Sequence, residues 1–226
     1  MSEKRKDPLQ DATPKAEIRH IAIEGVIGAG KTSLALMLAE RLQAKLILEE
    51  FEDNPFLAKF YEDPDHYAFH TQIYFLLSRY RQLQELRQAD LFHEYLIADY
   101  IFEKDRIFAY LNLADDELKL YETITASIEH NVPVPDLVVY IQSGVDRLIE
   151  NIHKRGRDTD RRIGEQYLKD LNEAYNYFFF RYKAAPLLIV NATQIDFVGN
   201  EQHFEDLVRE IFRKDRAPVE YYNPVK

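Results

Sequence analysis

The segment IEGVIGAGKTS, residues 23–33, is the most informative part of this sequence for predicting its fold. It lies between an apolar segment expected to be a strand, residues 19–24, and a segment with helical spacing of apolar residues, 32–43. It matches the P-loop pattern Gly-x-x-x-x-Gly-Lys-[Ser/Thr], in which glycines let backbone N–H groups surround a phosphate without Cβ clashes. Three of the seven glycines in the chain, Gly25, Gly28 and Gly30, lie in this loop. Lys31 and Thr32 follow them directly.

Two side chains of this loop have expected functions in binding a nucleoside triphosphate. Lys31 is expected to reach the β- and γ-phosphates, and Thr32 is expected to offer its hydroxyl group to Mg²⁺. The N-terminus of the following helix adds partial positive charge beside the phosphates. The sequence therefore predicts an ATP site made of Gly25, Gly28, Ala29, Gly30, Lys31, Thr32 and Ser33.

The composition favours one domain with a sizeable core, since 46% of the 226 residues are hydrophobic. The net charge of −10 disfavours a nucleic-acid partner. The absence of cysteine excludes disulfides, thiolate metal sites and cysteine nucleophiles, and it fits a cytoplasmic protein. No apolar run approaches the ~20 residues that span a membrane. We expect a flexible tail at 1–17, which lacks the apolar segment of a secretory signal, a domain over 18–215 and a C-terminal tail at 216–226.

Short apolar segments alternate with longer helical patterns along the chain. This alternation predicts an α/β fold, with a five-stranded parallel sheet covered by helices on both faces. Ligands of such sheets bind at the carboxyl ends of the strands. The expected strands are residues 19–24, 45–49, 95–98, 136–141 and 187–190. The expected helices are residues 32–43, 54–62, 65–89, 101–112, 115–130, 144–155, 164–184 and 201–214.

A basic segment late in the chain, HKRGRDTDRR at 153–162, is the second candidate for phosphate binding. Arginine offers a fork of donors that matches phosphoryl oxygens, so this segment is expected to form a lid over the phosphates. The alternative is a solvated, salt-bridged helix end. The basic residues of this expected lid are Lys154, Arg155, Arg157, Arg161 and Arg162.

Together with the P-loop, four further stretches resemble the deoxynucleoside kinases, the group of enzymes for deoxycytidine, deoxyguanosine and deoxyadenosine. The resemblance covers residues from about 20 to 185, and the stretches stand in the family's order and spacing. They are EEFEDNPFLAKFYEDP (49–64), FHTQIYFLLSRYRQL (69–83), ADYIFEKDRIFA (98–109) and HKRGRDTDRRIGEQYL (153–168). The resemblance implies a P-loop kinase fold with an arginine-rich lid, ATP and Mg²⁺ as cofactors, and a homodimer.

The resemblance also implies functions for particular residues. Glu49 matches the general base that takes the proton of the sugar 5′-hydroxyl; Glu50 is the competitor, since adjacent residues at a strand end point to opposite sides. Gln72 and Arg79 are seven residues apart, so they share one helix face. They match residues that contact the base, with Asp105 as the carboxylate partner of Arg79. The alternative for that face is an ordinary polar stripe on an exposed helix.

The remaining implied residues surround the sugar and the phosphates. Tyr61 and Asp160 match positions that hold the sugar 3′-hydroxyl. Asp99 matches an acid that helps to bind Mg²⁺, and Arg155 and Arg157 match lid arginines that contact the phosphates.

The chain departs from the family at two positions. In the family motif acid-Arg-Ser the arginine contacts the phosphates or the 5′-oxygen. Here the motif is replaced by Asp99-Tyr100-Ile101, which leaves this contact to Arg106 or to a lid arginine. Asn151 stands where some members of the family carry arginine at the first lid position.

These features predict transfer of the ATP γ-phosphate to the 5′-hydroxyl of a 2′-deoxynucleoside. The expected base is a purine, deoxyguanosine or deoxyadenosine, with deoxycytidine as the alternative. A nucleoside monophosphate kinase similar to thymidylate kinase is the nearest alternative enzyme, but it needs a second phosphate site, and no clear arginine pair outside the lid provides one. A non-catalytic nucleotide-binding subunit of the same fold is the alternative from another class.

Overall fold

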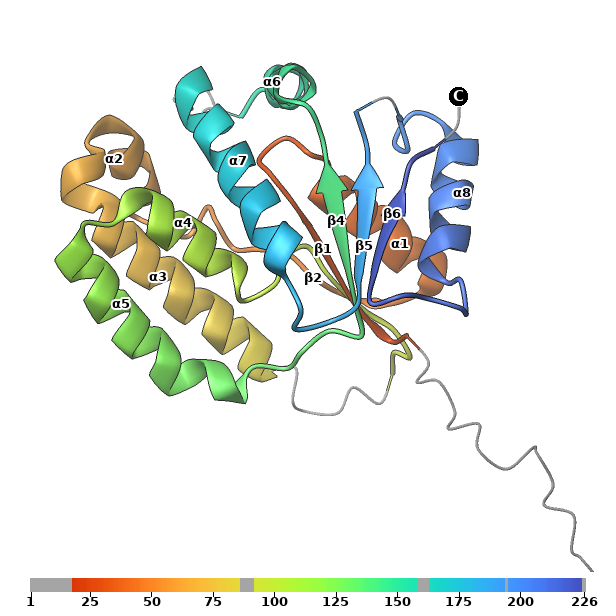
Figure 1. The fold of residues 1–226 in the computed structure, drawn as a ribbon, viewed down its shortest axis with the longest axis horizontal. Helices are drawn as coiled ribbons and strands as arrows, with labels where there is room; N and C mark the ends of the chain where they lie inside the picture. The colour runs from red at the N-terminus through yellow and green to blue at the C-terminus, as the bar shows by residue number, and fades with distance from the viewer. Residues whose placement is uncertain (1–17, 86–91, 158–162, 194, 225–226) are drawn as a thin grey trace, which may run out of the picture.

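Figure 1 shows the computed structural model of the chain, which describes residues 18–85, 92–157, 163–193 and 195–224. One sheet runs through the described part, and its strands follow the spatial order β2-β3-β1-β4-β5-β6. Every neighbouring pair of strands is parallel, as the sequence predicts. The strands are β1 (His20–Gly25), β2 (Lys45–Ile47), β3 (Leu96–Ala98), β4 (Leu137–Gln142), β5 (Leu187–Asn191) and β6 (Val219–Tyr222).

The sheet has six strands, so the expectation of five was wrong. The additional strand, β6, comes from the segment that the sequence analysis assigned to a C-terminal tail, and it pairs with β5 from Leu187 to Val190. Its sequence Val-Glu-Tyr-Tyr is exposed at alternate positions. It therefore lacks the continuous apolar run by which the other strands were recognised, because an edge strand is only half covered.

Helices lie on both faces of the sheet (Figure 1). They are α1 (Lys31–Leu42), α2 (Leu57–Glu62), α3 (Pro64–Glu85), α4 (Lys104–Asn112), α5 (Asp115–Ile128), α6 (Val145–Arg155), α7 (Glu165–Arg181) and α8 (Glu201–Ile211), with a short 3₁₀ turn at Glu129–Asn131. In Figure 1, α1 and α8 cover one face, while α7 covers the other together with the group of α3, α4 and α5. No helix in the described ranges is long and apolar enough to cross a membrane.

Two hydrophobic clusters hold these layers together. The larger cluster contains the buried strands β1, β4 and β5 with the inner faces of α1, α7 and α8. The smaller cluster joins α3 to α4 and α5. It includes five apolar residues of α3 that recur every three or four positions: Phe69, Ile73, Leu76, Tyr80 and Leu83.

Because α3 is packed on both sides, several polar side chains along it are buried. Gln72 and Arg79 are each only 4% exposed. The alternative of a polar stripe on an exposed helix was therefore wrong, because these side chains face the space between α3 and the sheet rather than water.

Candidate active site

The P-loop has the backbone geometry that its glycines predict. Gly28 and Gly30 have φ angles of 86° and 96°, in the left-handed region that other residues rarely adopt. The Lys31 ammonium donates a hydrogen bond to the backbone oxygen of Gly25 at 2.7 Å, so it lies inside the loop. Burial and the positive charge of Lys104 lower the pKa of Lys31 to about 8. A negatively charged ligand here would stabilise the charged form of this lysine.

Helix α6 holds the P-loop from outside. The Asn151 side-chain amide donates a hydrogen bond to the backbone oxygen of Gly28 at 2.8 Å. A Cβ atom on Gly28 would lie 2.6 Å from the backbone oxygen of Leu148, which is too close. Asn151, which the sequence analysis placed at the first lid position, therefore ties α6 to the P-loop. The other loop residues assigned to the ATP site are Ala29, which is buried, and Ser33, which is half-buried.

A hydroxyl and a carboxylate meet at the end of β3. The Thr32 hydroxyl donates to Asp99 Oδ2 at 2.7 Å, and the backbone N–H of Glu49 donates to Asp99 Oδ1 at 2.8 Å. Oxygen ligands of this kind suit Mg²⁺, which is commonly held by one or two protein groups together with substrate phosphates. Thr32 and Asp99 fit a magnesium site in type and position. Asp99 also ties this site to the residue that follows β2.

Glu49 lies two residues beyond β2, and its carboxylate is paired on both oxygens. Arg79 Nε donates to Oε1 at 2.8 Å, and the Lys104 ammonium donates to Oε2 at 2.7 Å. Burial alone would raise the pKa of the Glu49 carboxyl, but the charges and hydrogen bonds of Lys104 and Arg79 hold it well below its usual range. Glu50 is exposed, with a 3.5 Å contact to Ser78. Of the two adjacent acids, Glu49 is therefore the one that faces the pocket, as the sequence favoured.

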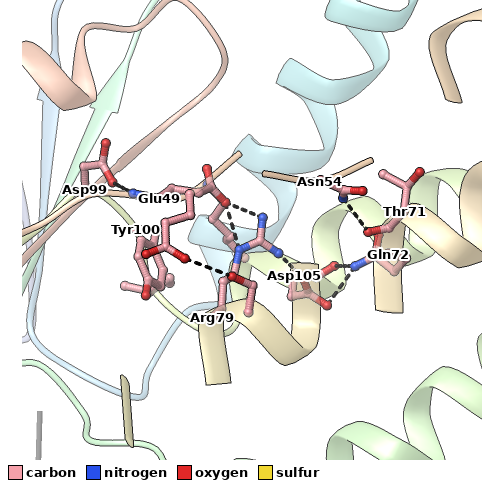
Figure 2. Close-up of polar contacts among 12 residues, drawn as sticks. Glu49, Asn54, Thr71, Gln72, Arg79, Asp99, Tyr100 and Asp105 are labelled. Carbon is pink, nitrogen blue, oxygen red and sulfur yellow. Dashed lines mark hydrogen bonds and ion pairs between the residues drawn. The ribbon is translucent and has the colours of Figure 1, made fainter. Parts of the chain in front are cut away.

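Arg79 joins two carboxylates that are far apart in the sequence (Figure 2). Besides Glu49 it pairs with Asp105, whose side chain is 1% exposed. The Gln72 amide donates to Asp105 Oδ2 at 2.7 Å and to the Asp105 backbone oxygen at 2.8 Å. Burial would lower the pKa of Arg79, but Glu49 and Asp105 raise it, so the guanidinium stays charged. The predicted set of Gln72, Arg79 and Asp105 is thus one connected network.

A buried asparagine attaches the segment after Glu49 to α3. The Asn54 amide donates to the backbone oxygen of Thr71 at 3.1 Å, as Figure 2 shows. Its side-chain oxygen accepts from the backbone N–H of Phe56 at 3.0 Å, just before α2. Asn54 is 5% exposed, so these bonds form away from water. It thereby holds the pocket wall made by α2 against the helix that carries Gln72 and Arg79.

One pocket, with a volume of about 1000 Å³ measured out to its mouth, collects most of the predicted site residues. A pocket of this size is ample for a small ligand. The predicted residues that line it are Lys31, Thr32, Glu49, Tyr61, Gln72, Arg79, Asp99, Arg155 and Arg157.

Some predicted residues lie elsewhere. Asp105 is behind the pocket wall and acts on it through Arg79 and Gln72. Lys154 is exposed at the end of α6. Asp160, together with Arg161 and Arg162 of the expected lid, lies outside the described residues. Of the lid residues, Arg155 and Arg157 reach the pocket, and Arg157 stacks on Phe51 with its guanidinium carbon 4.6 Å from the ring centroid.

Two residues near the altered motif do not reach the pocket. Tyr100, which replaces the family arginine, is buried in the smaller hydrophobic cluster, where its hydroxyl donates to Gln82 at 2.8 Å. Arg106 pairs with Glu129 at 2.5 Å and is 36% exposed. Arg106 was one of the two replacements expected for the missing arginine, and its position contradicts that expectation.

Sequence reasoning missed Lys104, the first residue of α4. It lines the pocket and is 2% exposed. The signal available was a lysine directly before Asp105; this lysine is five residues after Asp99, the start of the altered motif. A solvated lysine at a helix start is the ordinary interpretation of such a residue, and only the packing of α4 brings it to Glu49.

Known proteins of similar sequence cover most of this chain. The sequence model described as deoxynucleoside kinase matches residues 21–215. A deoxyguanosine kinase of Bacillus subtilis (strain 168) is 35% identical over 196 residues, which cover 84% of this chain and 95% of the relative. A deoxyadenosine/deoxycytidine kinase of the same organism is 30% identical over 205 residues, covering 88% of this chain and 93% of the relative.

Solved structures of a deoxyadenosine kinase from M. mycoides are similar in fold. The structure with the products dCMP and a flexible dCDP has a TM-score of 0.75 at 27% identity, covering 84% of this chain and 97% of the other. The structure with bound dATP has a TM-score of 0.74 at 25% identity, covering 86% and 99%. The family model, over residues 21–215, spans the P-loop, α3, the altered motif and the lid segment.

Proposed function

The chain belongs to the deoxynucleoside kinase family, and we propose that it transfers the γ-phosphate of ATP to the 5′-hydroxyl of a purine 2′-deoxynucleoside. The products are ADP and the deoxynucleoside 5′-monophosphate. The purine nucleoside is deoxyguanosine or deoxyadenosine, and we assign the enzyme to nucleotide salvage. The relatives named for these two nucleosides support this choice.

The observation that carries the proposal is a continuous row of contacts from the P-loop to Gln72. Thr32 bonds to Asp99, Asp99 accepts from the backbone of Glu49, and Glu49 pairs with Arg79. Figure 2 shows Asp99, Glu49, Arg79, Asp105 and Gln72 along this row. A triphosphate at Lys31 and Thr32 and a base at Gln72 and Arg79 would thus place the sugar beside Glu49.

The chemistry consists of one displacement at the γ-phosphorus. The 5′-oxygen forms a bond to this phosphorus, and the bond from phosphorus to the oxygen it shares with the β-phosphate breaks. The leaving electron pair stays on that oxygen in ADP, and the 5′-hydroxyl proton goes to the Glu49 carboxylate. Lys31, Arg155 and Arg157 act on the charge of the phosphate oxygens. Most of the acceleration then comes from positioning and charge stabilisation.

Thr32 and Asp99 are the residues that would hold Mg²⁺, through the Thr32 hydroxyl and one Asp99 oxygen. When bound, this ion neutralises charge on the β- and γ-phosphate oxygens. The hydrogen bond from the Glu49 backbone to Asp99 keeps the carboxylate of Asp99 oriented toward the P-loop side of the pocket.

The acceptor is recognised at two places. Gln72 and Arg79 present amide and guanidinium groups to the base edge, and Asp105 keeps the buried Arg79 paired. Tyr61 and Asp160 hold the sugar 3′-hydroxyl, which favours deoxyribose over sugars that lack this group. Tyr61 lines the same pocket, which supports its part of this assignment.

We place the active enzyme in the cytoplasm as a homodimer that uses the outer faces of α3 and α5. Each of these helices exposes a leucine: Leu77 is 50% exposed and Leu120 is 51% exposed. Sedimentation of the purified chain measures the stoichiometry. A charged substitution at Leu77 is expected to yield monomers, and a dimer that persists would argue against this interface.

A phosphorylation assay with ATP, Mg²⁺ and each of the four deoxynucleosides tests the reaction directly. Deoxyguanosine or deoxyadenosine should give the highest kcat/KM, and a leading pyrimidine would contradict the purine assignment. Deoxynucleoside monophosphates serve as alternative acceptors, and their preferential phosphorylation would indicate a monophosphate kinase. ATP binding without transfer to any acceptor would indicate a non-catalytic subunit.

Thermal shifts give an independent measurement of binding. With ADP and Mg²⁺ present, the accepted nucleoside at 100 times its Kd stabilises the folded state by about 2.7 kcal/mol. This corresponds to an increase in Tm of about 5–10 °C for a chain of this length. A nucleoside that is not a substrate should leave the Tm unchanged.

A further inference from the structure

Lys104 is a buried cation whose position the P-loop pattern does not explain. It begins α4, its side chain is 3% exposed, and its Nζ lies 2.7 Å from Glu49 Oε2. An ammonium group has three N–H donors, and within the described residues Nζ makes this one hydrogen bond. Since Lys104 also lines the pocket, its remaining donors are available to a ligand there.

Lys104 interacts with charged groups on two sides, the P-loop lysine and the candidate base. Its positive charge contributes to the lowered pKa of Lys31, so the two ammonium groups interact. On its other side it bonds to Glu49. Glu24 is fully buried and interacts electrostatically with both lysines. A cation that interacts with the P-loop lysine and contacts the candidate base is positioned beside the phosphoryl group as it passes from ATP to the 5′-oxygen.

Glu24 also ties the loop before α4 to the P-loop. Its Oε1 accepts from the backbone N–H of Ile101 and its Oε2 from that of Gly25, each at 3.0 Å. These two bonds join the end of β1 to the segment that leads into α4. The position of Lys104 relative to the phosphate-binding loop is therefore set by a buried connection rather than by a flexible surface loop.

We propose that Lys104 is a catalytic residue of the transfer reaction proposed above, whose ammonium moves from Glu49 Oε2 to an oxygen of the migrating phosphoryl group. It thereby takes the function of the arginine that is absent at Tyr100. Tyr100 is directed into the smaller hydrophobic cluster and Arg106 toward Glu129, so neither supplies this charge.

The two bonds to Glu49 explain why the exchange is needed. Arg79 alone holds Oε1 and so keeps the carboxylate oriented. Lys104 occupies Oε2, which is the oxygen left to accept the proton of the 5′-hydroxyl. When the 5′-oxygen bonds to the γ-phosphorus, the proton goes to Oε2, and the electron pair of the broken bond stays on the β-phosphate oxygen. Lys104 stays protonated throughout, now bonded to a phosphoryl oxygen.

Substitutions of Lys104 separate its charge from its hydrogen bond. Lys104→Gln can still donate to Glu49 but has no charge, Lys104→Met has neither, and Lys104→Arg keeps both. The matched control is Lys169→Met, which breaks the exposed Lys169–Glu165 pair, also at 2.7 Å, on α7. For each variant we would measure kcat, the KM for the best deoxynucleoside, the Kd for ADP and the Tm.

We expect kcat to fall on the order of 10²–10³-fold in Lys104→Gln and Lys104→Met, because removing a group that stabilises transition-state charge has an effect of this size. The nucleoside KM and the Kd for ADP should stay within about threefold of wild type, because the charge acts in the transition state. Lys104→Arg should restore kcat to within about tenfold. Lys169→Met should behave as wild type in every measurement.

A binding experiment without turnover completes the test. Aluminium fluoride with ADP imitates the migrating phosphoryl group, so it should tighten nucleoside binding in wild type but not in Lys104→Gln. Wild-type kcat in Lys104→Gln, or an unchanged fluoride effect despite a lower kcat, would overturn the proposal; in the latter case Lys104 only holds Glu49. If the wild-type chain phosphorylates no deoxynucleoside, the proposed function itself fails, which the wild-type assay shows before any variant is made.

Discussion

At the scale of single residues, Glu49 is the position on which the proposed chemistry depends. Its carboxylate is held by Arg79 and Lys104 and lies in the same pocket as the P-loop lysine. Replacing Glu49 by glutamine removes the proton acceptor and keeps the shape of the side chain. Turnover is therefore expected to fall by on the order of 10²–10⁴, with nucleoside binding largely kept. Steady-state kinetics with the best deoxynucleoside measures both quantities.

The neighbouring acid provides the control for this substitution. Glu50 is exposed, and the Ser78 hydroxyl lies 3.5 Å from its carboxylate. Glu50→Gln should therefore leave kcat unchanged. The opposite result, near-normal turnover in Glu49→Gln with loss in Glu50→Gln, would transfer the function of general base to Glu50.

Arg79 links the base pocket to Glu49, so its removal should affect both binding and stability. Arg79→Ala removes the guanidinium that the buried carboxylates of Glu49 and Asp105 share, and breaking a buried ion pair costs about 3–5 kcal/mol. The Tm is expected to fall by about 2–4 °C for each kcal/mol. The nucleoside KM should rise, while the KM for ATP stays near wild type because Arg79 lies away from the P-loop. An unchanged nucleoside KM in folded protein would remove Arg79 from the base pocket.

At the scale of elements, the contact between the P-loop and α6 makes Gly28 intolerant of a side chain. Gly28→Ala would place a Cβ 2.6 Å from the Leu148 backbone oxygen, at a φ angle of 86°. We expect a loss of about 1–3 kcal/mol from backbone strain and a higher Kd for ATP, since the loop must shift away from α6. Calorimetric ATP titration and thermal unfolding measure the two effects.

Gly164 is a matched control on the same chain. It has a φ angle of −70°, and a Cβ there would meet nothing within 4 Å. Gly164→Ala should therefore leave both the Tm and ATP binding unchanged or slightly improved. If Gly28→Ala also behaves in this way, then the P-loop does not need the conformation described here.

At the scale of the whole molecule, β6 forms one edge of the sheet, and β4 and β5 separate it from β1, β2 and β3, where the pocket lies. It pairs with β5, and Glu220 within it forms ion pairs with Arg213 and Arg216. A chain that ends at Asp215 should have a lower Tm and a greater tendency to aggregate, because β5 would become an exposed edge strand. Its KM values should stay within about twofold of wild type, since the pocket lies at β1, β2 and β3.

A shorter deletion controls for this truncation. Removing only Val225 and Lys226 leaves β6 in place and should leave the Tm unchanged. If the chain that ends at Asp215 has the wild-type Tm as well, then residues 216–226 contribute nothing to stability, as a tail would.

Several elements could be predicted from the amino-acid sequence because their causes are local. Glycine spacing predicts the P-loop, continuous apolar runs predict the inner strands, and a 3.6-residue period predicts the packed face of α3. These features depend on residues close together in the chain, where steric and periodic rules act directly. The matched stretches also pointed to Glu49, Gln72, Arg79 and Asp99, which the pocket brings together.

Contacts between charged residues far apart in the chain could be identified only in the folded protein. Lys104 and Glu49 are 55 positions apart, yet they bond inside the pocket because α4 follows β3, which lies beside β2 in the sheet. The same packing turns Tyr100 into the hydrophobic cluster and places β6 at the edge. The free energy of a buried charge depends on its surroundings in three dimensions, and no local pattern of residues records those surroundings.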